Sequence, residues 1–275
     1  MIVLHMVKKV HWSSVPFDRK RGNMATYESF AEVYDLFMDN VPYDVWKTHL
    51  LDILGQYHIT DGLVAELGCG TGKMTRRLAE AGYDMIGIDN SYDMLSIAME
   101  HPAEDILYLC QDMRAFELYG TVAAVISVCD SMNYIVEYED LVEVIRLVNN
   151  YLDPGGVFVF DMNTLYKYRT QLADHTFAEN REQGSFIWEN TFDEESRINE
   201  YDLTLYIQDE EDADYFMRFE EVHYQRAYEI AEIQKALQEG GMEFLGVLDA
   251  DTMGTVKETT ERMYVIAKEQ GKKRG

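Results

Sequence analysis

Three glycines within nine residues, in Val64-Ala65-Glu66-Leu67-Gly68-Cys69-Gly70-Thr71-Gly72, mark the turn from which the architecture of this chain can be read. The apolar residues before the first glycine predict a strand over residues 63–69, and the pattern after the last one predicts a helix over residues 73–81. Glycines between a strand and a helix allow a tight turn and let a ligand approach the main chain with no Cβ in the way. The sequence therefore predicts a ligand-binding turn at the end of a strand.

This turn matches neither of two common phosphate-binding loops. A dinucleotide-binding turn has the pattern G-x-G-x-x-G, but here the spacing is G-x-G-x-G and Lys73 stands where the third glycine would be. A P-loop needs G-x-x-x-x-G-K-[ST], but Met74 follows Lys73 and no glycine lies five residues before Gly72. Glu66, two residues before the first glycine, would repel a pyrophosphate and attract an ammonium group. The turn therefore favours a ligand with a positively charged amino-acid portion.

Short apolar runs alternate with helical patterns on both sides of this turn. Strands are predicted at residues 85–89, 106–110, 122–129 and 157–161, and helices at residues 91–99, with Ser91 as N-cap, and 139–151. A helix over residues 227–238 and strands at 244–248 and 263–267 close the chain, and upstream Val45, His49 and Ile53 recur at helical spacing. Apolar strands alternating with helices are typical of an α/β fold with a parallel sheet covered on both faces.

The pattern changes between residues 186 and 224, where apolar and polar residues alternate in the stretches 186–188, 201–207 and 215–224. Alternation with a period of two, interrupted by acidic turns, predicts an antiparallel β insertion. From Asp174 to Glu221 the chain has sixteen acidic residues against three arginines. A solvated strand face and an electrostatic funnel for a substrate both fit these acids, and the sequence leaves the two interpretations open.

The composition excludes several classes of protein. Of the 275 residues 47% are hydrophobic, which excludes global disorder, and 24 Lys plus Arg against 50 Asp plus Glu give a net charge of −26. Because such a surface repels phosphate groups, we expect no nucleic-acid or anionic membrane partner, and a small-molecule ligand that is neutral or cationic. Three cysteines without C-x-x-C spacing predict a reducing, cytoplasmic location and no metal site. No apolar run approaches the ~18 residues that cross a bilayer.

We expect one domain over residues 24–268. It contains a helical lid over about residues 24–60 and the β insertion over about residues 164–225. The basic residues 1–23 have no amphipathic period and are expected to be a leader without fixed structure, and residues 269–275 a tail.

Acidic side chains follow the second and third predicted strands. Asp89 ends the second strand, 21 residues after Gly68, where a carboxylate can accept hydrogen bonds from ribose hydroxyls. Asp112 follows the third strand and could accept one from an exocyclic adenine amine, with Met94 and Met113 against the ring. Either acid alone would be an ordinary strand-end residue. Together with the glycine turn and Glu66, they favour a nucleoside ligand that carries an ammonium group.

The glycine turn with Asp89 and Asp112 resembles the class I S-adenosylmethionine-dependent methyltransferases, and the resemblance extends over about residues 27–268. Four further segments resemble the YqeM-like branch of small bacterial methyltransferases: Tyr27-Glu28-Ser29-Phe30-Ala31 through Tyr34-Asp35, Val41-Pro42-Tyr43, Cys129-Asp130-Ser131-Met132-Asn133-Tyr134, and Glu221-Val222-His223-Tyr224. The leader before Met24 departs from the pattern of the family.

The resemblance implies a Rossmann-like α/β fold. Its sheet would have seven mostly parallel strands with the last one antiparallel, helices on both faces, and the antiparallel β insertion over the active site. S-adenosyl-L-methionine is the implied cofactor, with Gly68, Gly70 and Glu66 at its methionine portion, Asp89 at the ribose and Asp112 at the adenine. The predicted cofactor-binding residues are Tyr27, Tyr34, Glu66, Gly68, Cys69, Gly70, Gly72, Asp89, Asn90, Met94, Asp112, Met113 and Cys129.

Methyl transfer from a sulfonium requires no metal ion and no nucleophilic residue. Holding acceptor, methyl carbon and sulfur in line can supply ~7–11 kcal/mol of the barrier, and a general base is needed only for a protonated acceptor. The predicted catalytic residues are Asp130, Asn133 and Tyr134, after the fourth strand, and His223, near the end of the insertion. The aromatic residues Tyr27, Phe30 and Tyr34 could form a lid over the sulfonium or belong to ordinary core packing. Cys69 and Cys129 are expected to be small buried residues.

The sequence thus predicts an enzyme that transfers a methyl group from S-adenosylmethionine to an oxygen or nitrogen atom of a small molecule. Two alternatives stay open: a non-catalytic S-adenosylmethionine-binding protein that acts through protein contacts, and a methyltransferase acting on RNA or protein. A homodimer is compatible with the sequence.

Overall fold

The computed structural model describes residues 35, 37–39, 41–101, 106–209, 212 and 214–272. The predicted contacts Tyr27 and Tyr34 and the expected leader over residues 1–23 lie outside these residues, as do most of residues 24–40 and the last three residues of the expected tail.

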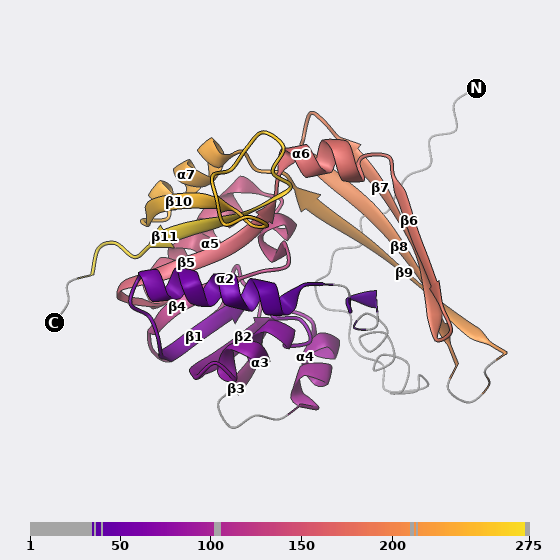
Figure 1. Ribbon diagram of the computed structural model, residues 1–275, viewed down its shortest axis with the longest axis horizontal. Helices are drawn as coiled ribbons and strands as arrows, with labels where there is room; N and C mark the ends of the chain where they lie inside the picture. The colour runs from indigo at the N-terminus through magenta and orange to yellow at the C-terminus, as the bar shows by residue number, and fades with distance from the viewer. Residues whose placement is uncertain are drawn as a thin grey trace.

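A seven-stranded sheet forms the body of the protein, in the order β10-β11-β5-β4-β1-β2-β3 (Figure 1). Strands β1 to β5 run parallel to one another, and β11 is antiparallel to both of its neighbours. The expected sheet with an antiparallel last strand is therefore confirmed. The bounds are β1 (Gly62–Leu67), β2 (Tyr83–Asp89), β3 (Ile106–Cys110), β4 (Val122–Ser127), β5 (Leu152–Asn163), β10 (Glu243–Asp249) and β11 (Arg262–Lys268).

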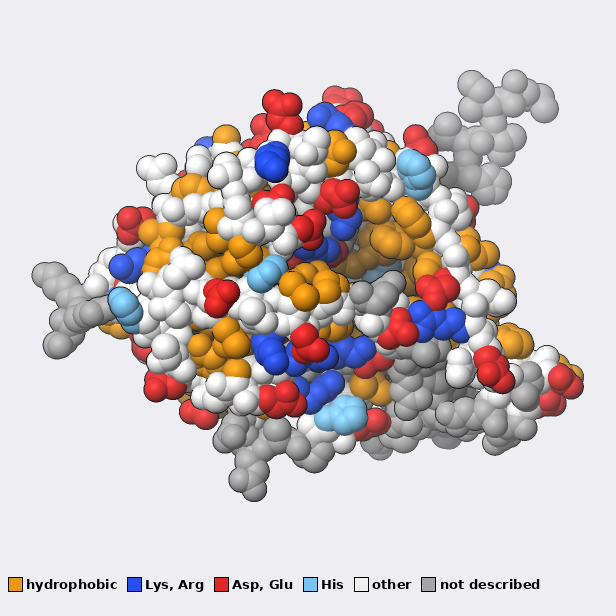
Figure 2. Space-filling view, in the orientation of Figure 1, with side chains coloured by type: hydrophobic (Ala, Val, Ile, Leu, Met, Phe, Trp, Pro, Cys, Tyr) orange, Lys and Arg blue, Asp and Glu red, His pale blue; other side chains and the backbone are white. Residues whose placement is uncertain are grey.

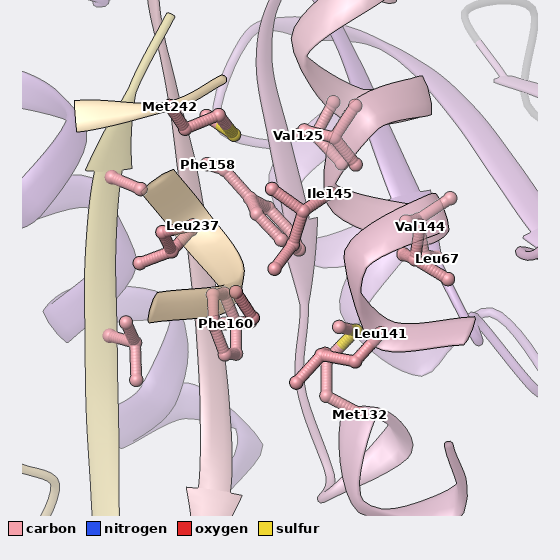
Figure 3. Close-up of a cluster of buried hydrophobic side chains, with 14 of the residues drawn as sticks. Leu67, Val125, Met132, Leu141, Val144, Ile145, Phe158, Phe160, Leu237 and Met242 are labelled. Atoms are coloured by element: carbon pink, nitrogen blue, oxygen red, sulfur yellow. The ribbon is translucent and has the colours of Figure 1, made fainter. Parts of the chain in front are cut away.

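Helices cover both faces of this sheet because each carries one apolar stripe. On one face, α2 (Tyr43–Gln56) and α3 (Lys73–Ala79) pack against β1, β4 and β5. On the other, α5 (Tyr138–Tyr151) and α7 (Ile230–Glu239) bury side chains such as Ile145 and Leu237 against Phe158 and Phe160 (Figure 3). The helix α4 (Tyr92–Met99) begins at Ser91, whose hydroxyl accepts a hydrogen bond from the main chain of Met94, as the N-cap prediction requires. None of the described helices is long and apolar enough to span a membrane.

A second, four-stranded antiparallel sheet is inserted between β5 and α7, after α6 (Leu165–Lys167) and the short helical segment η2 (Tyr168–Leu172) (Figure 1). Its strands follow the chain in the order β6 (Thr176–Arg181), β7 (Gly184–Asp193), β8 (Ile198–Gln208) and β9 (Phe216–Arg226). Three of these strands contain the predicted alternating stretches, and β6 was not predicted. The long strands of this four-stranded sheet extend away from the body, and the chain returns to the body at the end of β9 (Figure 1).

Two details of the sequence prediction were wrong. In α2 the predicted Ile53 is buried together with Trp46, Leu50 and Leu54, whereas the predicted Val45 is 49% exposed, so the buried face includes only part of the predicted stripe. The strand β4 ends at Ser127 and not at Cys129, because Cys129 and Asp130 have φ angles of 60° and 52°, which no strand residue adopts.

Candidate active site

The glycine turn is fastened to the end of β2. The main-chain N–H groups of Gly68 and Cys69 both donate to the carbonyl of Ile88, at 2.8 and 3.0 Å, and that of Gly72 donates to the carbonyl of Cys69 at 2.9 Å. Gly68, Gly70 and Gly72 have φ angles of 70°, 54° and 73°, in the left-handed region that favours glycine. The turn therefore lies at the carboxyl end of the parallel strands, where open α/β sheets bind their ligands.

Of these three glycines, only Gly70 leaves space for a ligand. A Cβ on Gly68 would lie 2.6 Å from Oγ of Ser131, and one on Gly72 would collide with the hydroxyl of Tyr108. A Cβ on Gly70 would meet no atom of the described residues within 4 Å. Gly68 and Gly72 are therefore required by the packing of the protein itself, and the ligand can approach the main chain at Gly70.

Asp89 joins the end of β2 to the glycine turn. One carboxylate oxygen accepts from the main-chain N–H of Gly70 and the other from that of Ser91, both at 2.8 Å. Burial raises the pKa of this carboxyl, and the main-chain donors oppose that effect. Because each oxygen has a second lone pair, Asp89 keeps the capacity to accept ribose hydroxyls while it holds the turn. Asn90, the next predicted contact, is exposed.

Glu66 is a buried carboxyl beside the turn, 2% exposed, and it accepts a hydrogen bond from the hydroxyl of Thr75. Its pKa is raised to about 8: burial is the main cause, the hydrogen bond from Thr75 opposes it, and the charge of Asp89 adds to it. A buried acid whose hydrogen-bond donors among the described residues come from the neutral Thr75 fits a ligand that brings an ammonium group. The carboxyl group of Glu66 thus suits the amino group of S-adenosylmethionine.

The third predicted acid, Asp112, is held by Arg114. The guanidinium contacts both carboxylate oxygens, at 2.5 to 3.1 Å, and this pairing lowers the pKa of Asp112. Met113 lies close to the turn, since its methyl would be 3.5 Å from a Cβ on Gly68, and Met94 lies half-buried in the first turn of α4. The adenine contacts at Asp112, Met94 and Met113 stay predictions.

The loop after β4 is held by a buried charged cluster that the sequence prediction missed. The carboxylate of Asp161, in β5, accepts from the main-chain N–H groups of Cys129 and Asp130 at 3.2 and 2.7 Å, which fixes their left-handed conformation. Arg262, at the start of β11, pairs with Asp161 at 2.7 Å and with Asp130 at 2.5 Å. Gln225, in β9, donates to the other oxygen of Asp130 at 2.7 Å. The sequence did offer one sign of this cluster: Asp161 is an acidic residue at the end of the apolar run over residues 157–160.

Asn133 does not face the site. Its side chain is 0% exposed, and its amide donates to the carbonyls of Asn163 and Arg226 and accepts from the N–H of Asn163. It ties the loop after β4 to β5 and to the end of β9, which is a structural task. The predicted catalytic position of this side chain is therefore not supported by its placement.

Tyr134 and His223 do come together. The ring of Tyr134, in the short helix η1 (Ser131–Tyr134), meets His223 edge to face at 5.8 Å, and its hydroxyl is hydrogen-bonded to that of Tyr201 in β8. The four-stranded sheet thus contacts the body at the loop after β4. Figure 2 shows a hollow lined by hydrophobic side chains between the body and the strands of this sheet.

Described residues of the predicted lid contact both sides of the site. Asp35 accepts from the hydroxyl of Thr71 at 2.8 Å and pairs with Lys73 at 3.2 Å, next to the glycine turn. Phe37 meets Phe186 of the four-stranded sheet edge to face at 5.0 Å. This segment thus links the turn to the inserted sheet.

The cysteines of the predicted set are partly or fully covered. Cys69 is buried and its side chain points toward Gly87, and burial raises the pKa of its thiol. Cys129 is half-buried and packs beside Tyr43. Among the described residues, no group of three or more His, Cys, Asp and Glu side chains could hold a metal ion.

Comparisons with known proteins agree with this geometry. A family model of a methyltransferase domain matches residues 64–156, from β1 into β5. A protein of Bacillus subtilis (strain 168) with the provisional name methyltransferase YqeM is 33% identical over 244 residues, which are 88% of this chain and 96% of that protein. A dTDP-3-amino-3,4,6-trideoxy-alpha-D-glucopyranose N,N-dimethyltransferase of Streptomyces venezuelae is 29% identical over 133 residues, 48% of this chain and 56% of that protein.

A solved structure extends the likeness to the whole fold. It is an S-adenosylmethionine-dependent methyltransferase from Clostridium acetobutylicum ATCC 824, with a TM-score of 0.77 and 29% identity, covering 89% of this chain and 99% of that one. The chain therefore belongs to the YqeM-like family of S-adenosylmethionine-dependent methyltransferases, and it is an enzyme whose cofactor is S-adenosylmethionine.

Proposed function

We propose that this enzyme transfers the methyl group to an oxygen or nitrogen atom of a small molecule that is neutral or positively charged. The contact of Tyr134 with Tyr201 and His223 carries this proposal, because it brings the inserted sheet against the loop after β4. A site covered by a sheet suits a small acceptor better than a nucleic acid. The net charge of −26 also favours an acceptor without negative charge.

The cofactor supplies a methyl group that is already activated on a sulfonium. In the proposed arrangement Glu66 and the main chain at Gly70 hold its amino-acid portion, Asp89 holds the ribose, and Asp112 binds the adenine, whose ring Met94 and Met113 contact. The chain then has to orient the acceptor and exclude water from the cleft. The lid over residues 24–60, with Tyr27 and Tyr34, and the insertion over residues 164–225 are the segments we assign to that task.

Two side chains are suited to act on the acceptor. His223 has Nε2 2.8 Å from the carboxylate of Glu221, and when that nitrogen carries the proton, Nδ1 carries a lone pair that can take a proton from the acceptor. Asp130 is held on both oxygens, by Arg262 and by Gln225, so it can orient a polar acceptor group without moving. The nitrogen acceptor named for the Streptomyces venezuelae relative supports the nitrogen alternative.

The test is a transfer assay with S-adenosylmethionine that carries a labelled methyl group, incubated with a metabolite extract and, separately, with RNA and with protein from the same cells. The proposal expects label in a small molecule, on nitrogen or oxygen by mass fragmentation. Label in RNA or protein alone would refute it. The Gly70→Val variant, whose side chain fills the ligand space, is the control without transfer.

A further inference from the structure

A row of aromatic side chains crosses the inner face of the four-stranded sheet, one from each strand: Phe177, Trp188, Tyr201 and His223. Phe177 lies opposite Trp188 and Tyr201 opposite His223, while Trp188 lies opposite Leu203, two residues from Tyr201, so all four share one face. Successive rings have centroids 5.2, 5.3 and 4.8 Å apart. We call these four residues the aromatic row.

The aromatic row ends at the loop that flanks the methyl group in the proposed function. Tyr134, from that loop, contacts both His223 and Tyr201. Gln225, two residues beyond His223 and on the same face, reaches Asp130 at 2.7 Å. A ligand along the row would therefore have one end at the loop after β4 and the other near β6.

The row is not fully covered. Phe177 is 37% exposed, and Trp188, Tyr201 and His223 are half-buried, whereas aromatic side chains that serve only as core are buried. The indole Nε1 of Trp188 is buried and has no hydrogen-bond partner among the described residues. A buried donor without a partner costs stability, so a ligand that offers it an oxygen or nitrogen atom would relieve that cost.

Carboxylates surround the inner end of the row. The carboxylate of Glu221 contacts Nε2 of His223. The carboxylate of Asp130 accepts a hydrogen bond from the side chain of Gln225. The pKa of Asp93, in the first turn of α4, is raised by burial and then by the negative charge of Glu221. Two cations lie near Asp130: Arg262, which is paired with Asp130 and Asp161, and Lys167, whose ammonium donates to the side-chain oxygen of Asn163 at 2.9 Å. Aromatic faces beside carboxylates are the surroundings that a substituted ammonium prefers.

We propose that the aromatic row is the acceptor subsite and that the acceptor is an amine carried on a planar ring, with the ring along Trp188 and Tyr201 and the nitrogen at Glu221 and His223. This inference rests on the proposed function, because it names the substrate class of the same site. The ammonium gives a proton to Nδ1 of His223, and the nitrogen lone pair then forms the bond to the methyl carbon. The carbon–sulfur bond breaks with its electron pair left on sulfur, which yields adenosylhomocysteine and a methylated ammonium.

The test compares three probes on the enzyme saturated with adenosylhomocysteine: 2-phenylethylamine, 2-phenylethanol, which has the ring without the charge, and butylamine, which has the charge without the ring. Calorimetry should show 2-phenylethylamine binding about tenfold more tightly than 2-phenylethanol, the ratio that about 1.4 kcal/mol of charge-assisted contact gives, and also more tightly than butylamine, which lacks the ring contacts with Trp188 and Tyr201. Equal binding of the amine and the alcohol, or no binding of 2-phenylethylamine, would overturn the inference. An enzyme that fails to bind adenosylhomocysteine would instead refute the proposed function.

Two variants separate the two recognition elements. Glu221→Gln should remove most of the preference for 2-phenylethylamine over 2-phenylethanol, because it removes the charge beside His223. Trp188→Leu should weaken both ring probes about equally. Val222→Ala, on the exposed outer face of the same strand, is the matched control and should change neither. All three should bind adenosylhomocysteine like the parent enzyme, and a preference for the amine that persists in Glu221→Gln would contradict the assignment.

Discussion

Cofactor binding should release a proton from Glu66. This carboxyl is buried and its pKa is raised to about 8, so at pH 7 only about one-tenth of the ligand-free enzyme carries the charge that an ammonium group needs. Below pH 7 the ammonium of the ligand is fully charged, since α-amino groups have a pKa of about 7.7–8.0. The apparent Kd for adenosylhomocysteine should therefore fall about 30-fold from pH 5.5 to pH 7.0, which is about 2 kcal/mol.

Titration calorimetry in two buffers of different ionisation enthalpy measures the released protons directly. At pH 7 we expect a net release of about 0.8 proton for each adenosylhomocysteine bound, because Glu66 loses about 0.9 proton and the amino group of the ligand takes up about 0.1. A matched ligand, 5′-methylthioadenosine, lacks the amino-acid portion and should release none. In Glu66→Gln the slope with pH should disappear, apart from any contribution of Asp89, the nearest other acid.

A pH-independent Kd for adenosylhomocysteine, with no proton released, would refute this reasoning. The same group also affects folding. Its folded pKa lies above its unfolded one, so its contribution to stability is fully present below about pH 4.5 and is lost as the pH rises through about 8. The free energy of unfolding of the ligand-free enzyme, compared with that of Glu66→Gln, should fall over this range.

Three further changes test the rest of the site. Gly70→Val should abolish adenosylhomocysteine binding, because its side chain enters the space that the described residues leave at Gly70, and it should also lower the melting temperature, because residue 70 has a φ of 54°, which a β-branched residue adopts only with strain; normal binding would show that the ligand does not approach there. Asp89→Ala should weaken cofactor binding by ~1.5–3 kcal/mol, the usual cost of losing hydrogen bonds to a charged acceptor, and an unchanged affinity by calorimetry would remove Asp89 from the ribose role. Arg262→Met should lower the free energy of urea unfolding by ~3–5 kcal/mol, because it leaves Asp161 and Asp130 without their cation, and Arg262→Lys should recover part of it; a loss below ~1 kcal/mol would mean that the cluster does not hold the loop.

The parallel part of the fold could be predicted because its strands consist of short, nearly continuous apolar runs, even in the half-exposed edge strand β3. The predicted strand at residues 106–110 matches β3 at both ends, and the N-cap at Ser91 follows from its side chain alone. The strand β6 was missed because five of its six residues are not large apolar side chains, and its pairing with β7 depends on the neighbouring strand.

The candidate site was predictable where a residue acts locally. Glycines at positive φ and an acid at a strand end are visible in a single segment. The pairing of Arg262 with Asp161 joins positions 101 residues apart, and no local pattern specifies it. Asn133 shows the opposite difficulty, because a polar residue in a functional loop can serve the packing of the main chain.

The most direct test is a crystal structure of the enzyme with adenosylhomocysteine. Density for the amino-acid portion should lie against the main chain of Gly70, with its nitrogen at the carboxylate of Glu66 and the ribose hydroxyls at Asp89. Density at another place, or a crevice at Gly70 that remains filled by the protein's own side chains, would contradict the account.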